Sequence, residues 1–281
     1  MWNVRDKTCV VTGASAGIGK ETALGLARLG ARVAIVCRDR DRGAAAVAET
    51  RAAGSPQVEL FLADLSLQDD VRRLAGQLVE RLARIDVLLH NAGVVMRERV
   101  VTRDGIEATL AVNHLAPFLL TQLLRPTIEA PARIVVVASQ VEARGRIDFG
   151  DLSFARTPYD PLAAYYQSKL ANVLFTYELT RRLRDTDITA NCLHPGVIAT
   201  NLLCDYMGRP RVMSKVHRLT HPGPKEGAQV SLKLATDPAL TGVSGRYFRP
   251  EGEGASSKQS YDPELARRLW EVSEQLTGLS S

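Results

Sequence analysis

A single doubly wound α/β domain with a mainly parallel sheet of about seven strands is the fold that the sequence predicts. Short apolar runs alternate with helix-like stretches along the chain, which is the pattern of successive β-α-β units. Residues 134–138 are continuously apolar, as in a parallel strand that is buried on both faces. Because parallel strands are joined by right-handed crossovers, a doubly wound sheet is the simplest topology.

The predicted elements follow one another with short connections. The strand candidates are residues 8–11, 32–36, 58–62, 87–90, 134–138, 188–193 and 245–248. The clearest helical stretches are residues 21–29, 69–82 and 163–184. Apolar spacing predicts a closing helix through Leu265, Leu269, Val272 and Leu276. Two irregular stretches, 142–162 and 197–224, interrupt the alternation, and we expect the second to form a substrate lid.

The composition limits the classes of function. A chain of 281 residues without repeats or an obvious linker suits one domain over residues 1–281. Its apolar runs are shorter than the roughly 18 residues that span a bilayer, and its start lacks the apolar core of a signal peptide, so we expect a cytoplasmic protein. Five basic residues and no acid fall between positions 208 and 225. The rest of the chain carries 31 basic and 31 acidic residues, unlike a nucleic-acid-binding protein.

Neither the cysteines nor the histidines have the spacing of a metal site. The four cysteines are scattered, so we expect no disulfides: Cys9, Cys37, Cys192 and Cys204. His217 and His221 are four residues apart, but no acidic residue lies between them and Pro222 follows at once. Surface histidines are the favoured interpretation, and we predict no metal.

A glycine-rich turn follows the first predicted strand. Residues 12–19 read Thr-Gly-Ala-Ser-Ala-Gly-Ile-Gly, and a helix begins there. Glycines permit a tight turn and a close backbone approach to a pyrophosphate at the positive end of a helix. The Gly-x-x-x-Gly-x-Gly spacing differs from the G-x-G-x-x-G fingerprint, and a plain strand-to-helix connection is the alternative. Its place at the first β-α turn favours nucleotide binding.

This turn and later motifs together resemble the short-chain dehydrogenase/reductase family over essentially the whole chain. The later motifs are, in chain order, Asp64-Leu65, Asn91-Ala92-Gly93, Asn113, Ser139, Tyr165-x-x-x-Lys169 and Pro195-Gly196. Within the family, three segments look most like the retinol dehydrogenase-like group: Lys169-Leu-Ala-Asn172, His194-Pro-Gly196 and Arg268-Leu-Trp270. The resemblance implies a Rossmann-type fold and a nicotinamide cofactor.

The resemblance also assigns the residues that would contact the cofactor. They are Gly13, Ser15, Ala16, Gly17, Ile18, Gly19, Arg38, Asp64, Leu65, Asn91, Ala92, Gly93, Tyr165, Lys169, Pro195, Gly196, Val197 and Thr200. Relatives usually carry an asparagine where this chain has His90, and we expect His90 to be a hydrogen-bonded structural residue. Asn91 and its neighbours would border the adenine ribose, whereas the segment after Pro195 would touch the nicotinamide amide.

The end of the second strand predicts the choice between NAD and NADP. A carboxylate there would bind both ribose hydroxyls and repel a 2′-phosphate. This chain has Cys37-Arg38-Asp39, and a guanidinium matches a phosphate in charge and geometry, so NADP(H) is favoured over NAD(H). The alternative is that Arg38 is a solvated surface residue, and Asp39 could partly cancel its field.

Tyr165 and Lys169 are the predicted proton-transfer pair. Carbonyl reduction needs a proton on oxygen, and the pKa of free tyrosine, about 10, is too high for efficient exchange near neutrality. A lysine ammonium one helical turn away favours the phenolate. Tyr166, at i−3 from Lys169, is a second candidate, and the family spacing selects Tyr165. The resemblance gives Ser139 the role of binding the substrate oxygen; a strand-end serine that bonds the backbone is the alternative.

Asn113 is the fourth catalytic residue that the resemblance implies, and it would hold a water in a proton relay through Lys169. Pro117 lies four residues later and has no N–H for the Asn113 carbonyl. We therefore expect a kink there and a carbonyl that is free to bind water.

The predicted function is NADP(H)-dependent interconversion of a hydrophobic ketone or aldehyde and its alcohol. The pocket is expected to be apolar because the two irregular stretches contain Phe149, Phe154, Tyr159, Leu202, Tyr206 and Met213. The alternatives are a catalytically silent NADP-binding regulatory protein, or an epimerase or dehydratase that uses the same nucleotide site. The resemblance suggests a homodimer or homotetramer, although residues 139–165 could cover such an interface and leave a monomer. The substrate and the reaction direction stay open.

Overall fold

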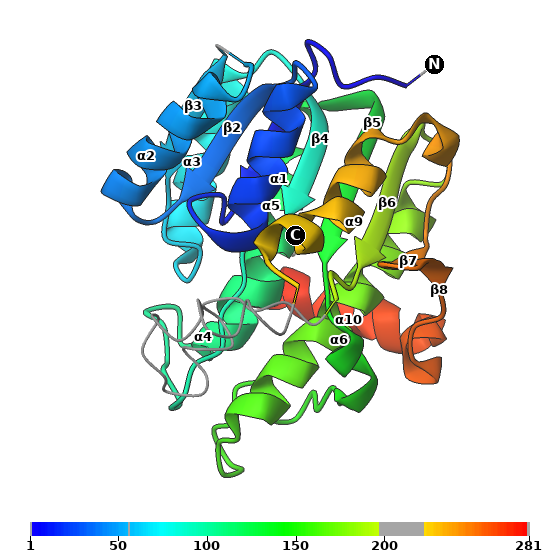
Figure 1. Ribbon diagram of the computed structural model, residues 1–281. Helices are drawn as coiled ribbons and strands as arrows, with labels where there is room; N and C mark the ends of the chain where they lie inside the picture. The colour runs from blue at the N-terminus through cyan, green and yellow to red at the C-terminus, as the bar shows by residue number, and fades with distance from the viewer. Residues whose placement is uncertain (1, 56, 197–221, 280–281) are drawn as a thin grey trace.

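The computed structural model describes residues 2–55, 57–196 and 222–279, and one eight-stranded sheet runs through them (Figure 1). The strands are β1 (Thr8–Thr12), β2 (Arg32–Cys37), β3 (Val58–Leu62), β4 (Ile85–His90), β5 (Ile128–Val137), β6 (Ile188–Leu193), β7 (Tyr247–Arg249) and β8 (Gly252–Gly254). The α-helices are α1 (Gly17–Arg28), α2 (Arg40–Ala52), α3 (Gln68–Arg81), α4 (Ala108–Leu110), α5 (Ala116–Leu124), α6 (Pro161–Arg182), α9 (Pro224–Thr236) and α10 (Pro263–Leu276). A π-helical turn η1 (Ala111–Leu115) joins α4 to α5, and three 3-10 turns are η2 (Gln140–Arg144), η3 (Pro238–Leu240) and η4 (Lys258–Tyr261).

The strand order is β3-β2-β1-β4-β5-β6-β7-β8, which is a doubly wound sheet as predicted. Strands β1 to β7 pair in parallel, and β8 pairs antiparallel with β7. The sheet has eight strands, whereas the sequence predicted about seven. β8 is the missing strand: its sequence Gly-Glu-Gly has no apolar alternation, so nothing in it indicates a strand.

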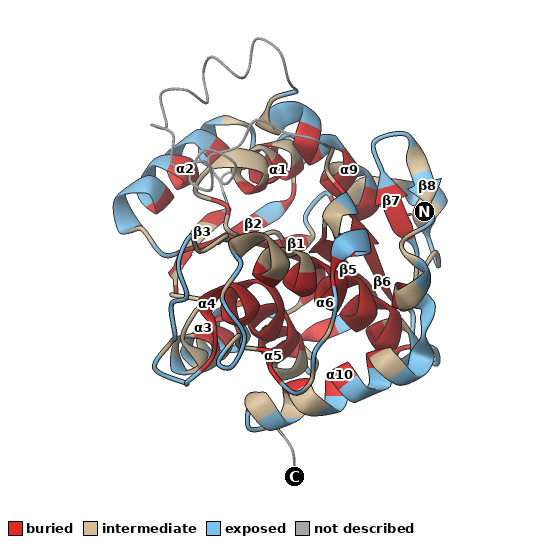
Figure 2. Cartoon of the chain, turned by 90° about the horizontal axis from the view of Figure 1, so that it is seen from below, coloured by how far each residue is buried: buried red, intermediate tan, exposed pale blue. Residues whose placement is uncertain are grey.

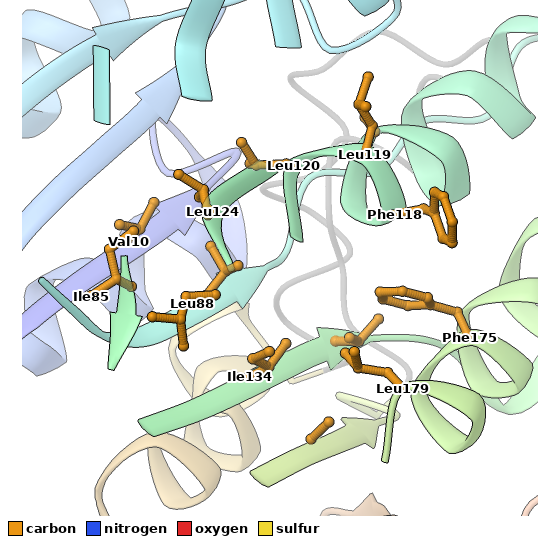
Figure 3. Packing of buried hydrophobic residues seen from close by; sticks show 14 of the residues in the cluster. Val10, Ile85, Leu88, Phe118, Leu119, Leu120, Leu124, Ile134, Phe175 and Leu179 are labelled. Atoms are coloured by element: carbon orange, nitrogen blue, oxygen red, sulfur yellow. The ribbon is translucent and has the colours of Figure 1, made fainter. Parts of the chain in front are cut away.

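Helices cover both faces of the sheet, and a separate hydrophobic cluster fills each side (Figures 1 and 2). Helices α1, α2 and α9 cover one face, whereas α3, α5 and α6 cover the other. Near the start of α5 and the middle of α6, the rings of Phe118 and Phe175 meet edge to face at 5.9 Å between centroids (Figure 3). Trp270 of α10 packs on both rings, which confirms the predicted closing helix. No helix in the described ranges is long and apolar enough to cross a membrane.

The parallel strands bring the predicted site residues to one edge of the sheet. β1, β2, β4 and β5 end at Thr12, Cys37, His90 and Val137, so the segments that follow them meet at the carboxyl edge. β1 is the switch point, because the chain moves outward from it first through β2 and then through β4. Ligands of doubly wound folds bind at such an edge.

Candidate active site

The glycine-rich turn has the backbone that a phosphate site needs. Gly13 and Gly17 have φ angles of +69° and +58°, in the left-handed region that favours glycine. A Cβ added to Gly19 would lie 2.5 Å from the carbonyl oxygen of Gly13, so only glycine lets α1 start this close to the turn. The N-cap of α1 is Ala16, whose methyl group accepts no hydrogen bond from the N–H groups of the first turn. An anion is a suitable partner for those groups.

Asn91 fixes this turn from the neighbouring strand. Its Nδ2 donates to the carbonyl of Thr12 at 2.9 Å, and its backbone N–H donates to Thr12 Oγ1 at 3.0 Å. Thr12 Oγ1 also accepts from the N–H of Ala92 at 3.1 Å. The segment after β4 is thereby locked to the end of β1. The sequence did not indicate this role for Thr12.

Arg38 lies at the exposed end of β2. Its side chain is 70% exposed and its Nη1 lies 3.9 Å from Oδ2 of Asp64. Asp39 does not turn toward it: the Asp39 carboxylate caps α2 and bonds to the Arg42 N–H at 3.0 Å and to Arg42 Nε at 2.8 Å. These bonds from Arg42 hold the pKa of Asp39 below its ordinary value. The negative charge at position 39 is therefore paired with Arg42, and Asp64 is the carboxylate that faces Arg38.

Tyr165 and Lys169 lie on α6 beside the end of β5. Lys169 is 3% exposed, and its Nζ donates to the carbonyl of Val137 at 3.0 Å. The same Nζ lies 5.5 Å from the centroid of the Tyr165 ring. Burial lowers the pKa of Lys169 to about 8 and raises that of Tyr165 to about 12, the latter opposed by a hydrogen bond with Ser139. Ser139 thus meets Tyr165 in the structure.

The backbone of Tyr166 packs against the turn that follows Ser139. A Cβ added to Gly145 would clash with the Tyr166 carbonyl oxygen, so the two segments are in close contact. Lys169 faces the ring of Tyr165, the tyrosine that the family spacing selects. The choice of Tyr165 over Tyr166 as the acid stays a prediction.

Asn113 sits in the π-helical turn, four residues before Pro117. The N–H of Ala116 donates to the carbonyl of Ala111, five residues earlier, so the regular α-helical bonding is interrupted as predicted. The Asn113 side chain accepts from the Val94 N–H at 2.8 Å and donates to the Val94 carbonyl at 2.9 Å. The carbonyl of Asn113 has no donor at the α-helical position, because that position is a proline.

Ser168 connects Asn113 to the helix of Tyr165, a link that the sequence did not reveal. Asn113 Nδ2 donates to Ser168 Oγ at 2.9 Å, and Ser168 Oγ donates to the Tyr165 carbonyl at 2.7 Å. Gly93 lies where the two elements meet: an added Cβ there would be 3.5 Å from Asn113 Oδ1 and 3.6 Å from Lys169 Nζ. The four predicted catalytic residues are therefore brought together at this edge.

His90 and His114 are buried structural histidines. His90 Nε2 is 2.8 Å from Thr121 Oγ1, and His114 Nε2 is 2.9 Å from Ser273 Oγ. Burial lowers the pKa of each imidazole to about 3. The described cysteines are also buried and unpaired, and burial raises the pKa of each thiol: Cys9, Cys37 and Cys192. Within the described ranges, no group of three or more His, Cys, Asp or Glu residues is arranged to hold a metal.

The remaining predicted contacts fall partly outside the described residues. Pro195 and Gly196 follow β6, and Gly196 has a φ of +95°. Val197, Thr200 and residues 197–221 of the predicted lid lie outside the described ranges, and so does most of the basic segment. Phe149 is half-buried and packs against the cluster that contains Leu170 and Leu174, and the guanidinium of Arg268 lies 4.2 Å from its ring centroid.

The described residues at this edge fit a dinucleotide. The α1 turn offers backbone donors, and a Cβ added to Gly17 would meet no described atom within 4 Å, which leaves space for a ligand above it. Arg38 supplies an exposed cation, and Gly93 places backbone without a side chain next to Lys169. This combination of donors, charge and space is what a pyrophosphate, a ribose and a nicotinamide ring require.

Comparisons with known proteins agree with this geometry. A family model described as short chain dehydrogenase matches residues 7–207. The chain belongs to the short-chain dehydrogenase family. Human retinol dehydrogenase 14 is 40% identical to this short-chain dehydrogenase over 97% of the chain and 87% of its own length. Human retinol dehydrogenase 12 is 41% identical over the same shares of both proteins. This dehydrogenase is therefore an oxidoreductase of the retinol dehydrogenase-like group, acting on CH–OH or carbonyl groups.

A solved structure supports the fold of this short-chain dehydrogenase along its whole length. An uncharacterized protein from Mycobacterium paratuberculosis is 35% identical, with a TM-score of 0.81, and the match covers 99% of this chain and 96% of that one. The two proteins thus share the fold over nearly all of both chains.

Proposed function

We propose that this dehydrogenase interconverts a hydrophobic ketone or aldehyde and its alcohol with NADP(H), and that Tyr165 is the acid/base. The observation that carries the proposal is the meeting of Ser139, Tyr165 and Lys169 at the carboxyl edge of the sheet. Binding a cofactor alone requires a phosphate turn but no buried lysine beside a tyrosine. That pair favours proton transfer over a regulatory role.

In the reductive direction, the chain's own residues would hold the substrate oxygen and protonate it. The Ser139 hydroxyl would bind the oxygen next to the Tyr165 hydroxyl. Because the pKa of Tyr165 is raised to about 12, its hydroxyl is protonated at neutral pH and ready to act as the acid. Lys169, with a pKa near 8, is still mostly charged at pH 7 and would stabilise the phenolate as it forms. A bound nicotinamide would supply the hydride.

Asn113 is proposed to support proton return to Lys169. Its side chain is fully engaged with Val94 and Ser168, so its main-chain carbonyl is the group left to bind a water. The role of the side chain is then to hold the π-helical turn in place.

The proposed cofactor site runs along the same edge. The residues assigned to it are Gly13, Ser15, Ala16, Gly17, Ile18, Gly19, Arg38, Asp64, Leu65, Asn91, Ala92, Gly93, Tyr165, Lys169, Pro195, Gly196, Val197 and Thr200. NADP(H) is favoured because Arg38 is exposed and Asp39 is already paired with Arg42. Residues 197–224 are proposed as the lid, and the names of the retinol dehydrogenase relatives favour a hydrophobic substrate.

A substrate panel tests the proposal. The protein is mixed with NADPH or NADH and with all-trans-retinal, decanal or cyclohexanone, and the absorbance of the reduced cofactor is followed. Faster turnover of a hydrophobic carbonyl with NADPH than with NADH is expected. NADPH binding by fluorescence without turnover of any carbonyl would favour the regulatory protein and contradict the proposal.

A further inference from the structure

We propose that Glu142 positions Ser139 by anchoring the turn after β5 to a strap made of residues 255–261. The inference rests on the proposed function, because it assumes that Ser139 binds the substrate oxygen. Glu142 itself lies in the turn and meets the strap, so it would act through Ser139. It is therefore a positioning residue.

Ser139 lies beyond the last paired residue of its strand. β5 ends at Val137, and Ser139 is the N-cap of the short 3-10 turn η2. The N–H of Glu142 donates to the Ser139 carbonyl at 3.1 Å, and the N–H of Gly145 donates to the Glu142 carbonyl at 2.9 Å. A single turn of this kind has little stability of its own. The position of Ser139 therefore depends on what holds η2.

The Glu142 side chain connects η2 to the strap by two hydrogen bonds. It is 2% exposed, and its two carboxylate oxygens accept from the N–H and the Oγ of Ser257, each at 2.7 Å. Ser257 is 115 residues away in the chain. A buried carboxylate is costly unless it is hydrogen-bonded, so this bidentate contact fixes the turn to the strap in one arrangement.

A second contact and an aromatic stack complete the anchor. Gln259 Nε2 donates to the Gly145 carbonyl at 2.8 Å, at the other end of η2. The strap is in turn fixed to α6, because Tyr261 stacks on Tyr177 with 5.3 Å between ring centroids. The Tyr177 hydroxyl lies 2.7 Å from Ser256 Oγ.

The strap thus ties the turn of Ser139 to the helix that carries Tyr165 and Lys169. Gly145, at the end of the turn, also packs directly against the Tyr166 carbonyl of the same helix. The separation between Ser139 and Tyr165 is set by both contacts. A substrate oxygen must reach both hydroxyls at hydrogen-bond distance, and a misplacement of about 1 Å costs roughly 100-fold in rate.

The test compares Glu142→Ala, Glu142→Gln and a control, Trp2→Phe. Glutamine can still accept from the Ser257 N–H and donate to its Oγ, so it preserves the anchor. Trp2 Nε1 donates to the Ala235 carbonyl at 2.8 Å, and Trp2 precedes β1, at the amino edge of the sheet. Trp2→Phe therefore loses a buried long-range bond far from η2. We measure kcat for all-trans-retinal with NADPH, the NADPH Kd by fluorescence, and hydrogen exchange of residues 139–145.

In Glu142→Ala, kcat is expected to fall 10- to 100-fold with an NADPH Kd within twofold of wild type, and amides 139–145 are expected to exchange faster. Glu142→Gln should stay within about threefold of the wild-type kcat, and Trp2→Phe should leave kcat and this exchange unchanged. Unchanged kcat and exchange in Glu142→Ala would overturn the inference, and so would an equal fall of kcat in Trp2→Phe. If wild type turns over none of the carbonyls, the proposed function fails, whereas unchanged exchange refutes the anchor alone.

Discussion

Substitution of Arg38 by alanine should weaken NADPH binding and leave NADH binding nearly unchanged. A hydrogen bond to a charged group contributes about 1.5–3 kcal/mol, which corresponds to roughly 10- to 150-fold in affinity. The Arg38 side chain is 70% exposed and already lies 3.9 Å from Asp64, so solvent screening and this competing carboxylate place the effect near the lower limit. We expect an NADPH Kd raised about 10- to 30-fold.

The assay is fluorescence titration of each reduced cofactor at two salt concentrations. The wild-type preference for NADPH should shrink as ionic strength rises, because the contact is exposed. Arg40→Ala is the matched control, since Arg40 is an exposed arginine two residues further along, at the start of α2. An Arg38→Ala protein with unchanged NADPH affinity, or an equal loss in Arg40→Ala, would refute the reasoning.

Three further predictions follow from the same structure. Gly19→Ala should weaken both cofactors at least 100-fold, because its Cβ would lie 2.5 Å from the Gly13 carbonyl; equal titration curves for variant and wild type would contradict this. Carbonyl reduction should slow above about pH 8, because Lys169, with its pKa near 8, then loses the charge that stabilises the Tyr165 phenolate. The pH profile of kcat for wild type and Lys169→Met checks this, and the same inflection near pH 8 in the variant would count against it. Burial lowers the pKa of His90 to about 3, so His90 stays neutral in the folded protein and becomes charged on unfolding below about pH 6.5. The free energy of unfolding should therefore fall between pH 7 and pH 4.5, and His90→Asn should reduce this fall by about 3 kcal/mol in urea unfolding. Equal falls in the variant and wild type would disprove it.

The strands and the nucleotide turn were predictable from local sequence because their signals are local. Residues 134–138 are continuously apolar, so they predict a buried strand without knowledge of the strands beside them. The glycines of the turn are needed for backbone angles that other residues rarely adopt. The interruption near Asn113 was predictable for the same reason, because Pro117 lacks the N–H that a regular helix requires. Each of these features follows from a few neighbouring residues.

The parts that could not be predicted depend on partners far away in the chain. The three-residue β8 exists because β7 offers it a free edge, and its own glycines favour no strand. Lys169 donates to the Val137 carbonyl and Glu142 accepts from Ser257. These partners are 32 and 115 residues apart in the chain, so no local sequence spacing reveals the contacts. The sequence left open that Asp39 partly cancels the field of Arg38, and its role as the cap of α2 became visible only in the structure.

Single-turnover reduction by Tyr165→Phe and Tyr166→Phe tests the central claim most directly. Both variants keep the ring and lose only the hydroxyl, so packing is preserved in each. With saturating NADPH and a carbonyl that wild type reduces, Tyr165→Phe should lose at least 100-fold in rate at an unchanged NADPH Kd, whereas Tyr166→Phe should stay within about threefold of wild type. Retained reduction in Tyr165→Phe, together with its loss in Tyr166→Phe, would contradict the assignment of Tyr165 as the acid.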